Sequence, residues 1–143
     1  MSLAERIVRD APDAIIAADT DGRIVLWNAG AERLFGHPAA RALGQSLDLI
    51  IPEPFRARHW AGYRAVMQSG ATRYGTTLLR VPALHQDGRR ISVAFTVGLL
   101  KDQAGTVEGI FALLRDDTER WQTKRQLRQR LAELEGSPRT GPA

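Results

Sequence analysis

The stretch 19–36 constrains the fold more than any other part of the chain, because a turn, a strand and a capped helix follow one another directly. Asp21-Gly22 predicts a tight turn, since glycine takes positive φ without a Cβ clash. The apolar run 23–27 predicts a strand. Asn28 can accept a hydrogen bond from a free backbone N–H, so it predicts the start of a helix over 29–35.

Alternating apolar residues and turn signals extend this pattern along the chain. Strands are predicted over 14–19, 23–27, 73–84, 89–100 and 107–115. Helices are predicted over 3–10, 29–35, 38–43, 55–69 and 118–135, with a brief apolar turn over 47–51. These elements predict an α+β fold: a five-stranded antiparallel sheet with helices on one face, flanked by an N-terminal and a C-terminal helix. The strand order stays open.

Composition narrows the function classes. The chain has 143 residues, which suits one domain with an ordinary core, and it contains no cysteine. Disulfides, zinc-thiolate sites and cysteine nucleophiles are therefore excluded. A net charge of +4 permits nucleic-acid binding without arguing for it. The sequence shows neither a membrane-length apolar run nor a signal peptide, so a cytoplasmic location and no membrane partner are expected.

Three ordered motifs resemble a PAS domain over about residues 3–120. The run from Asp21 to Gly36 resembles the family's opening "DG.I..WN.aae.lfG" segment, 80–97 resembles its "…DG…" hairpin, and 115–120 resembles its "RDxTER" exit. The resemblance implies a sensor for signal transduction, with a small ligand in a cavity. An enzyme is not expected, because the sequence shows no catalytic constellation. Flavin is less expected than other cofactors, because the flavin-thiol members need a cysteine.

The expected organisation has four parts. Residues 1–12 form a cap helix, either a lid over one sheet edge or a dimerisation cap, and 13–117 form the PAS domain. Residues 118–135 form an amphipathic signalling or dimerisation helix, and 136–143 form a disordered tail. An apolar seam on that helix favours either a homodimer contact or packing onto the sheet. The seam consists of Leu127, Leu131 and Leu134. Both a stand-alone protein and a piece of a larger sensor are consistent with this pattern.

His59 is singled out among three histidines. His37 and His85 follow a helix stop and a turn, so both are expected to be exposed. His59 shares one face of the longest internal helix with Tyr63 and Met67, and that face is expected to meet the sheet. From the residues alone, a lone histidine of this kind is more often a hydrogen-bonded or surface residue than a ligand.

The family resemblance changes the expectation for His59. The segment 52–60 is similar to the "P…R.RH" segment of haem-PAS gas sensors, which implies His59 as the axial ligand of haem iron. Oxygen-sensing members carry a distal Arg where this chain has Leu79, with Arg80 on the other strand face. An apolar distal wall of Leu79, Phe95 and Val97 offers no donor to O2, which leaves CO, NO or redox sensing. The expected partners of the haem propionates are Arg64 and Arg73.

The predicted function is a PAS sensory module that binds a small ligand or cofactor and relays its state to a partner protein through the C-terminal helix. Haem b held by His59 is the named candidate; the alternative is a cofactor-free interaction and dimerisation module. A homodimer is expected, and nucleic acid is not. The predicted cavity lining, which core packing explains equally well, is Ile16, Val25, Ile50, Tyr63, Met67, Leu79, Phe95, Val97 and Leu113. Asp116-Asp117 is expected to cap the last helix and pair with Arg120.

Overall fold

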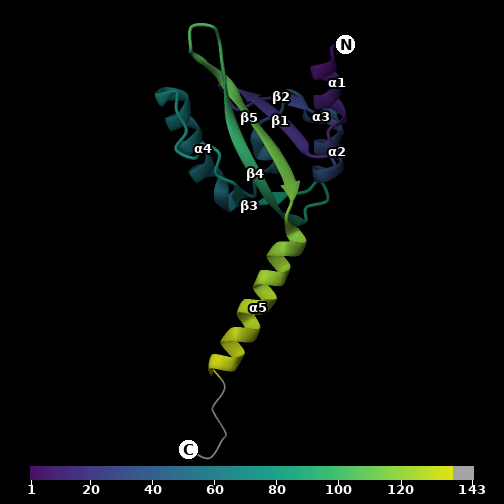
Figure 1. The fold of residues 1–143 in the computed structure, drawn as a ribbon, viewed down its shortest axis with the longest axis vertical. Coiled ribbons are helices and arrows are strands. Elements are labelled where there is room, and N and C mark those ends of the chain that lie inside the picture. The colour runs from purple at the N-terminus through teal and green to yellow at the C-terminus, as the bar shows by residue number, and fades with distance from the viewer. Residues whose placement is uncertain (137–143) are drawn as a thin grey trace, which may run out of the picture.

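A computed structural model describes residues 1–136 and confirms the α+β fold (Figure 1). The strands are β1 Ala14–Asp19, β2 Ile24–Trp27, β3 Leu79–Leu84, β4 Arg90–Lys101 and β5 Val107–Asp116. The helices are α1 Leu3–Asp10, α2 Ala29–Phe35, α3 Ala39–Ala42, the 3-10 turn η1 Leu47–Ile50, α4 Glu53–Ser69 and α5 Thr118–Gly136. All strand pairs are antiparallel, in the order β2-β1-β5-β4-β3. The chain's first and last strands therefore pair at the centre of the sheet.

One strand prediction is wrong in its first half. Residues 73–78 do not join β3, because the backbone turns there: Thr77 N–H donates to the Tyr74 carbonyl at 2.8 Å and Gly75 has φ +54°. β3 is an edge strand, which is where Pro82 is tolerated. At the other end of the chain, Gly136 is the last residue of α5, and the rest of the predicted disordered tail, 137–143, lies outside the described residues.

The core fills the space between the sheet and the short helices. Phe35 of α2 is fully buried, and its ring lies 5.5 Å from that of Trp27. From the sheet, Ile16 of β1, Val93 of β4 and Leu114 of β5 point into the same cluster. In Figure 1 α5 instead extends away from the sheet, and it has no buried residue. None of the helices within residues 1–136 combines the length and apolar character that a membrane-spanning helix needs.

Asn28 ties three elements together and confirms the predicted helix cap. Its side-chain oxygen accepts hydrogen bonds from Ala31 N–H in α2, at 2.9 Å, and from Ile15 N–H in β1, at 2.8 Å. Its amide nitrogen donates to the carbonyl of Val8 in α1, at 2.8 Å, and to that of Asp13, at 3.1 Å. The side chain is only 5% exposed, so water cannot replace these bonds.

Replacing Asn28 with Ala should therefore lower the free energy of unfolding by about 2–4 kcal/mol, because buried donors and acceptors lose their partner along with the cap. Chemical denaturation followed by circular dichroism measures the change. Gln103→Ala, in the exposed turn before β5, is the control and should change stability by less than about 0.5 kcal/mol. A loss below about 1 kcal/mol for Asn28→Ala would contradict this role.

Candidate ligand-binding site

Helix α4 is fastened at the β1–β2 turn by two aromatic side chains. The Tyr63 hydroxyl donates a hydrogen bond to the Asp19 carbonyl. The Trp60 ring lies directly over Gly22, where an added Cβ would come within 2.2 Å of the indole, and where φ is +78°. The indole N–H of Trp60 donates to Asp48 Oδ1 at 2.7 Å. These contacts attach the middle of α4 to the turn end of the β1–β2 hairpin.

The Tyr63 hydroxyl is suited to a permanent donor role. Burial, with Asp19 and Asp21 acting in the same direction, raises the pKa of Tyr63 to about 12. The hydroxyl thus stays protonated at physiological pH and keeps its bond to the carbonyl.

His59 lies one helical turn before Tyr63 and is held among rings. Its imidazole centroid is 4.7 Å from the Trp60 ring and 5.8 Å from the Tyr63 ring. Burial lowers the pKa of His59, although the Asp48 carboxylate acts in the opposite direction, so the neutral form is favoured. Its Nδ1 is buried and, within residues 1–136, has no hydrogen-bond partner. A neutral imidazole with an unpaired nitrogen is a chemically competent metal ligand.

The sheet opposite this helix is apolar and incompletely covered. Leu79 of β3 pairs in register with Phe95 of β4, which pairs with Leu114 of β5. Leu114 is buried, but Leu79, Phe95 and Val97 are only half-buried. In Figure 1 α4 runs beside this half of the sheet, yet Tyr63 is its one buried residue. The region thus has apolar surface that α4 does not fully cover.

The other predicted lining residues divide into two groups. Met67 and Ile50 pack against the core, and Ile16 belongs to it. Val25 and Leu113 were wrongly placed in the lining: they are 54% and 39% exposed. Leu113 pairs with Ile15 and Thr96, which alternate with the inward positions and so belong to the outer sheet face.

The two arginines predicted to meet haem propionates are not brought to His59. Arg64 and Arg73 are both exposed, and Arg73 stacks over the Tyr74 ring at 5.5 Å. Their role therefore stays a prediction. Arg56, which the sequence did not single out for this role, is linked to Trp60 through Asp48. It donates to the carbonyls of Ile51 and Asp48 at 3.0 and 3.3 Å, and the carboxylate of Asp48 accepts from Trp60.

His37 and His85 are half-buried, which corrects the expectation that both are exposed. The His85 ring lies against Gly36, and its Nδ1 accepts a hydrogen bond from Asp87 N–H at 3.2 Å. The His37 carbonyl accepts the indole N–H of Trp27 at 2.9 Å. Burial, then the nearby charges of His85 and Arg41, lowers the pKa of His37.

The exit from the sheet into α5 is bonded to β3 and β4. Asp117 forms its ion pair with Arg80, at 3.4 Å, and not with Arg120 as the sequence suggested. The backbone carbonyl of Ser92 in β4 accepts a hydrogen bond from Asp117 N–H at 2.7 Å. The backbone N–H of Ser92 donates to Thr118 Oγ1 at 3.1 Å. Asp116 Oδ1 accepts from Thr118 N–H at 2.8 Å, as a cap would.

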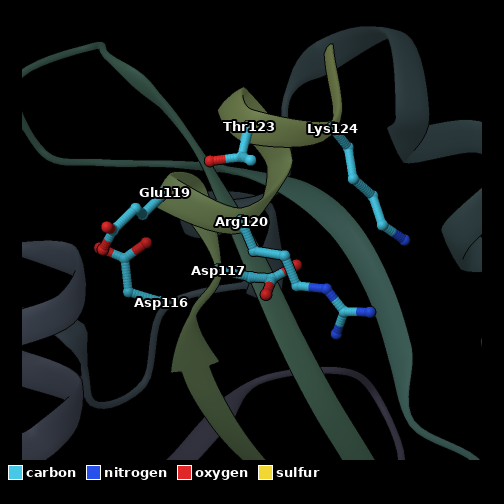
Figure 2. A pocket seen from close by; sticks show the side chains of 6 residues that line it. All are labelled: Asp116, Asp117, Glu119, Arg120, Thr123 and Lys124. Carbon is cyan, nitrogen blue, oxygen red and sulfur yellow. The ribbon is translucent and has the colours of Figure 1, made fainter. Parts of the chain in front are cut away.

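A shallow surface depression lies beside this exit, lined by Asp116, Asp117, Glu119, Arg120, Thr123 and Lys124. Figure 2 shows Asp117, Arg120 and Lys124 on one side of the first turns of α5, with Asp116 and Glu119 on the other. Side chains of both charges line it, and it shares no residue with the printed surroundings of His59, which are Trp60, Tyr63 and Asp48.

A profile of the PAS fold matches residues 8–122. The chain belongs to the PAS family. Sensor protein FixL of Bradyrhizobium diazoefficiens is 32% identical over 136 residues, covering 90% of this chain and 25% of the relative. Oxygen sensor protein DosP of Escherichia coli is 24% identical over 116 residues, covering 81% of this chain and 14% of the relative. This PAS domain thus spans a quarter or less of these two relatives.

Solved structures agree with the PAS assignment. An RNA-binding Light-Oxygen-Voltage receptor superposes with a TM-score of 0.75 at 26% identity, over 91% of this chain and 36% of the receptor. A PAS domain from Colwellia psychrerythraea superposes with a TM-score of 0.70 at 22% identity, over 81% of this chain and 95% of that domain. The chain is therefore a sensory PAS domain related to these sensor families.

The two lowered histidine pKa values predict acid sensitivity. An unfolded histidine titrates near pH 6.5, whereas folded His37 and His59 bind a proton less readily, so the unfolded state gains protons first. Their contribution to stability is complete above about pH 6.5 and is lost as the pH falls below it. Urea unfolding between about pH 7.5 and pH 5.5 should show decreasing stability, with a shallower slope in His37→Gln/His59→Gln. An identical slope in the double variant would contradict this attribution.

Proposed function

We propose that this PAS domain senses a small molecule through a haem that His59 holds between α4 and the β3–β5 part of the sheet. One observation carries the proposal: a neutral imidazole with an unpaired, buried nitrogen, on a helix that leaves apolar sheet surface incompletely covered. Buried polar groups are almost always paired, so an unpaired one calls for an explanation. A metal-bearing ligand supplies it.

The side chains around His59 suit haem in their chemistry. Haem contributes an iron that binds small gases or changes redox state. His59 would supply the single nitrogen ligand, and the edge-on ring of Trp60 and the tilted ring of Tyr63 restrict the orientation of its imidazole. Apolar side chains on the facing strands would exclude water from the haem plane. Leu79, Phe95 and Val97 are the strand residues proposed for this role.

The same apolar wall favours some gases over others. Leu79 carries no hydrogen-bond donor, and Arg80 extends on the opposite strand face to its ion pair with Asp117. A wall without donors gives no polar stabilisation to O2. We therefore propose CO, NO or redox state as the signal in preference to O2.

The proposed relay runs through β3 and β4 into α5. Leu79 would contact the cofactor from one face of β3, while its neighbour Arg80 holds Asp117 from the other. Ser92 fixes the same exit from β4. A shift of the strands would thus change the first turn of α5, through which a signalling partner protein would be reached. The sensor names of FixL and DosP agree with a sensing role, and the activity of any whole protein containing this domain belongs to the proposal.

Titration of the purified protein with haem tests the proposal. The expected result is a stoichiometric Soret band that shifts on adding CO. His59→Ala should weaken haem affinity by more than roughly tenfold, since the axial nitrogen is lost. His37→Ala is the matched control and should bind as the native protein does, because only its backbone carbonyl takes part in the Trp27 hydrogen bond.

Circular dichroism of each variant separates lost binding from lost folding. A folded His59→Ala variant whose haem absorption spectrum matched that of the native protein would contradict the axial role. Absence of any specific Soret band in the native protein would instead favour the alternative, a PAS interaction module without a cofactor.

A further inference from the structure

Helix α5 concentrates positive charge on one exposed segment. Five arginines and lysines and no carboxylate lie within 120–130, whereas the net charge of the whole chain is +4, so the rest of the chain is slightly acidic. Figure 1 shows α5 leading away from the domain, and the helix has no buried residue. The expectation that α5 packs onto the sheet is therefore wrong, and its basic segment is accessible to a partner.

Four of these cations share one side of the helix with a tryptophan. Residues that follow a first position by one, four, five and eight places lie on the same face of an α-helix. In α5 this face, here called the basic face, consists of Arg120, Trp121, Lys124, Arg125 and Arg128, all of them exposed. Figure 2 shows Arg120 and Lys124 on the same side of the first turns of the helix.

The cations of the basic face lack the carboxylate partners that neighbouring arginines have. Where the chain leaves the sheet, Arg80 pairs with Asp117 at 3.4 Å and Arg115 pairs with Asp13 at 3.0 Å. Within residues 1–136, no ion pair joins a cation of the basic face to a carboxylate. Glu119 lies on the other side of the helix in Figure 2. The positive charge thus remains available to an anionic partner.

Trp121 differs from the other two tryptophans in its contacts. The indole N–H groups of Trp27 and Trp60 donate hydrogen bonds at 2.9 and 2.7 Å. The Trp121 indole has no hydrogen-bond partner among the described residues and is 49% exposed. The Arg125 guanidinium lies 5.4 Å from the centroid of its ring. An exposed indole backed by a guanidinium is a flat surface on which an unpaired base can stack.

We propose that the occupant of the basic face is a single strand of nucleic acid. Residues 120–128 rise by about 12 Å along the helix, and one strand of stacked nucleotides carries a phosphate about every 3.4 Å. About four phosphates therefore pass along the four cations, while Trp121 stacks on a base. This pairing of cations with an aromatic ring binds single strands with little sequence preference. It revises the expectation that nucleic acid is not a partner, because net charge alone does not show that the cations gather on one face.

Other polyanions use only part of this arrangement. A duplex presents phosphates, but its bases are already stacked on one another, so Trp121 gains no partner. A lipid surface requires the apolar residues of a helix to share one face. The leucines of α5, at 127, 131 and 134, lie about a third of a turn around the helix from Trp121. A single strand is the partner that uses both the cations and the indole.

Fluorescence anisotropy of the haem-free full chain with labelled oligo-U and oligo-dT, each of about 16 nucleotides, tests the proposal independently of the His59 site. We expect a Kd of about 1–100 μM near physiological salt. The logarithm of the affinity should fall against that of the salt concentration with a slope of about −3, because each of the four phosphates contributes roughly 0.7. Arg128→Gln should weaken binding and reduce this slope by about 0.7. Arg130→Gln is the matched control: it removes the same charge from another side of the helix and should leave the slope unchanged.

Trp121→Ala separates stacking from charge. It should weaken single-strand binding by roughly tenfold without changing the salt slope, and Trp121→Phe should restore part of the loss. A duplex of the same length should bind more weakly than the single strand and be indifferent to Trp121→Ala. All the substituted side chains are exposed, so the variants should fold as the native protein does, which circular dichroism verifies.

Several results would overturn the proposal. They are absence of single-strand binding at low salt, an equal effect of Arg128→Gln and Arg130→Gln, and single-strand binding that Trp121→Ala leaves unchanged. Displacement of the oligonucleotide by an equal charge concentration of polyglutamate would show that any polyanion suffices. Tighter binding to phosphatidylserine vesicles than to the oligonucleotides would assign the face to a lipid surface instead.

Discussion

The attachment of α4 to the β1–β2 turn determines how closely this helix must pack on the rest of the sheet. The hydroxyl of Tyr63 reaches the Asp19 carbonyl, and Trp60 lies over Gly22, where no side chain could be accommodated. Because the attachment is at the hairpin end, the helix need not pack tightly on the strands beside it. A helix held mainly by its own apolar face would instead have to close on the sheet to be stable.

The sheet's inner face consequently has two regions of different character. Phe35 of α2 and Val93 of β4 are sealed from water and belong to an ordinary core. Beside α4, Leu79, Phe95 and Val97 are apolar but half-buried. His59 belongs to this second region, where burial lowers its pKa and leaves one nitrogen unpaired. The proposed function thus places ligand binding beside a different part of the sheet from the sealed core.

Much of this could be predicted from the sequence, because local signals determine it. The Asp21-Gly22 turn and the Asn28 cap act within a few residues. Each of the five strands overlaps a predicted segment, although β3 begins six residues later than predicted. The inward orientation of Leu79 followed from its distance to the next turn, and its register with Phe95 agrees.

The errors arise where local pattern carries no information about long-range contacts. Leu113 and Val25 are apolar on the outer face, so hydrophobicity could not tell the two faces of β5 and β2 apart. The ion pair of Asp117 crosses to β3, and no spacing near Asp117 points to Arg80. Burial of His85 depends on Gly36 meeting the β3–β4 turn, which only the tertiary fold brings about.

Hydrogen exchange of the protein with and without haem tests the central claim most directly. Binding between α4 and the sheet predicts slower amide exchange in residues 53–69 and 79–101, together with a change of exchange in 117–121 where α5 begins. Protection confined to other segments would contradict the site. Protection of α4 and the strands without any change at the start of α5 would contradict the relay while leaving the site intact.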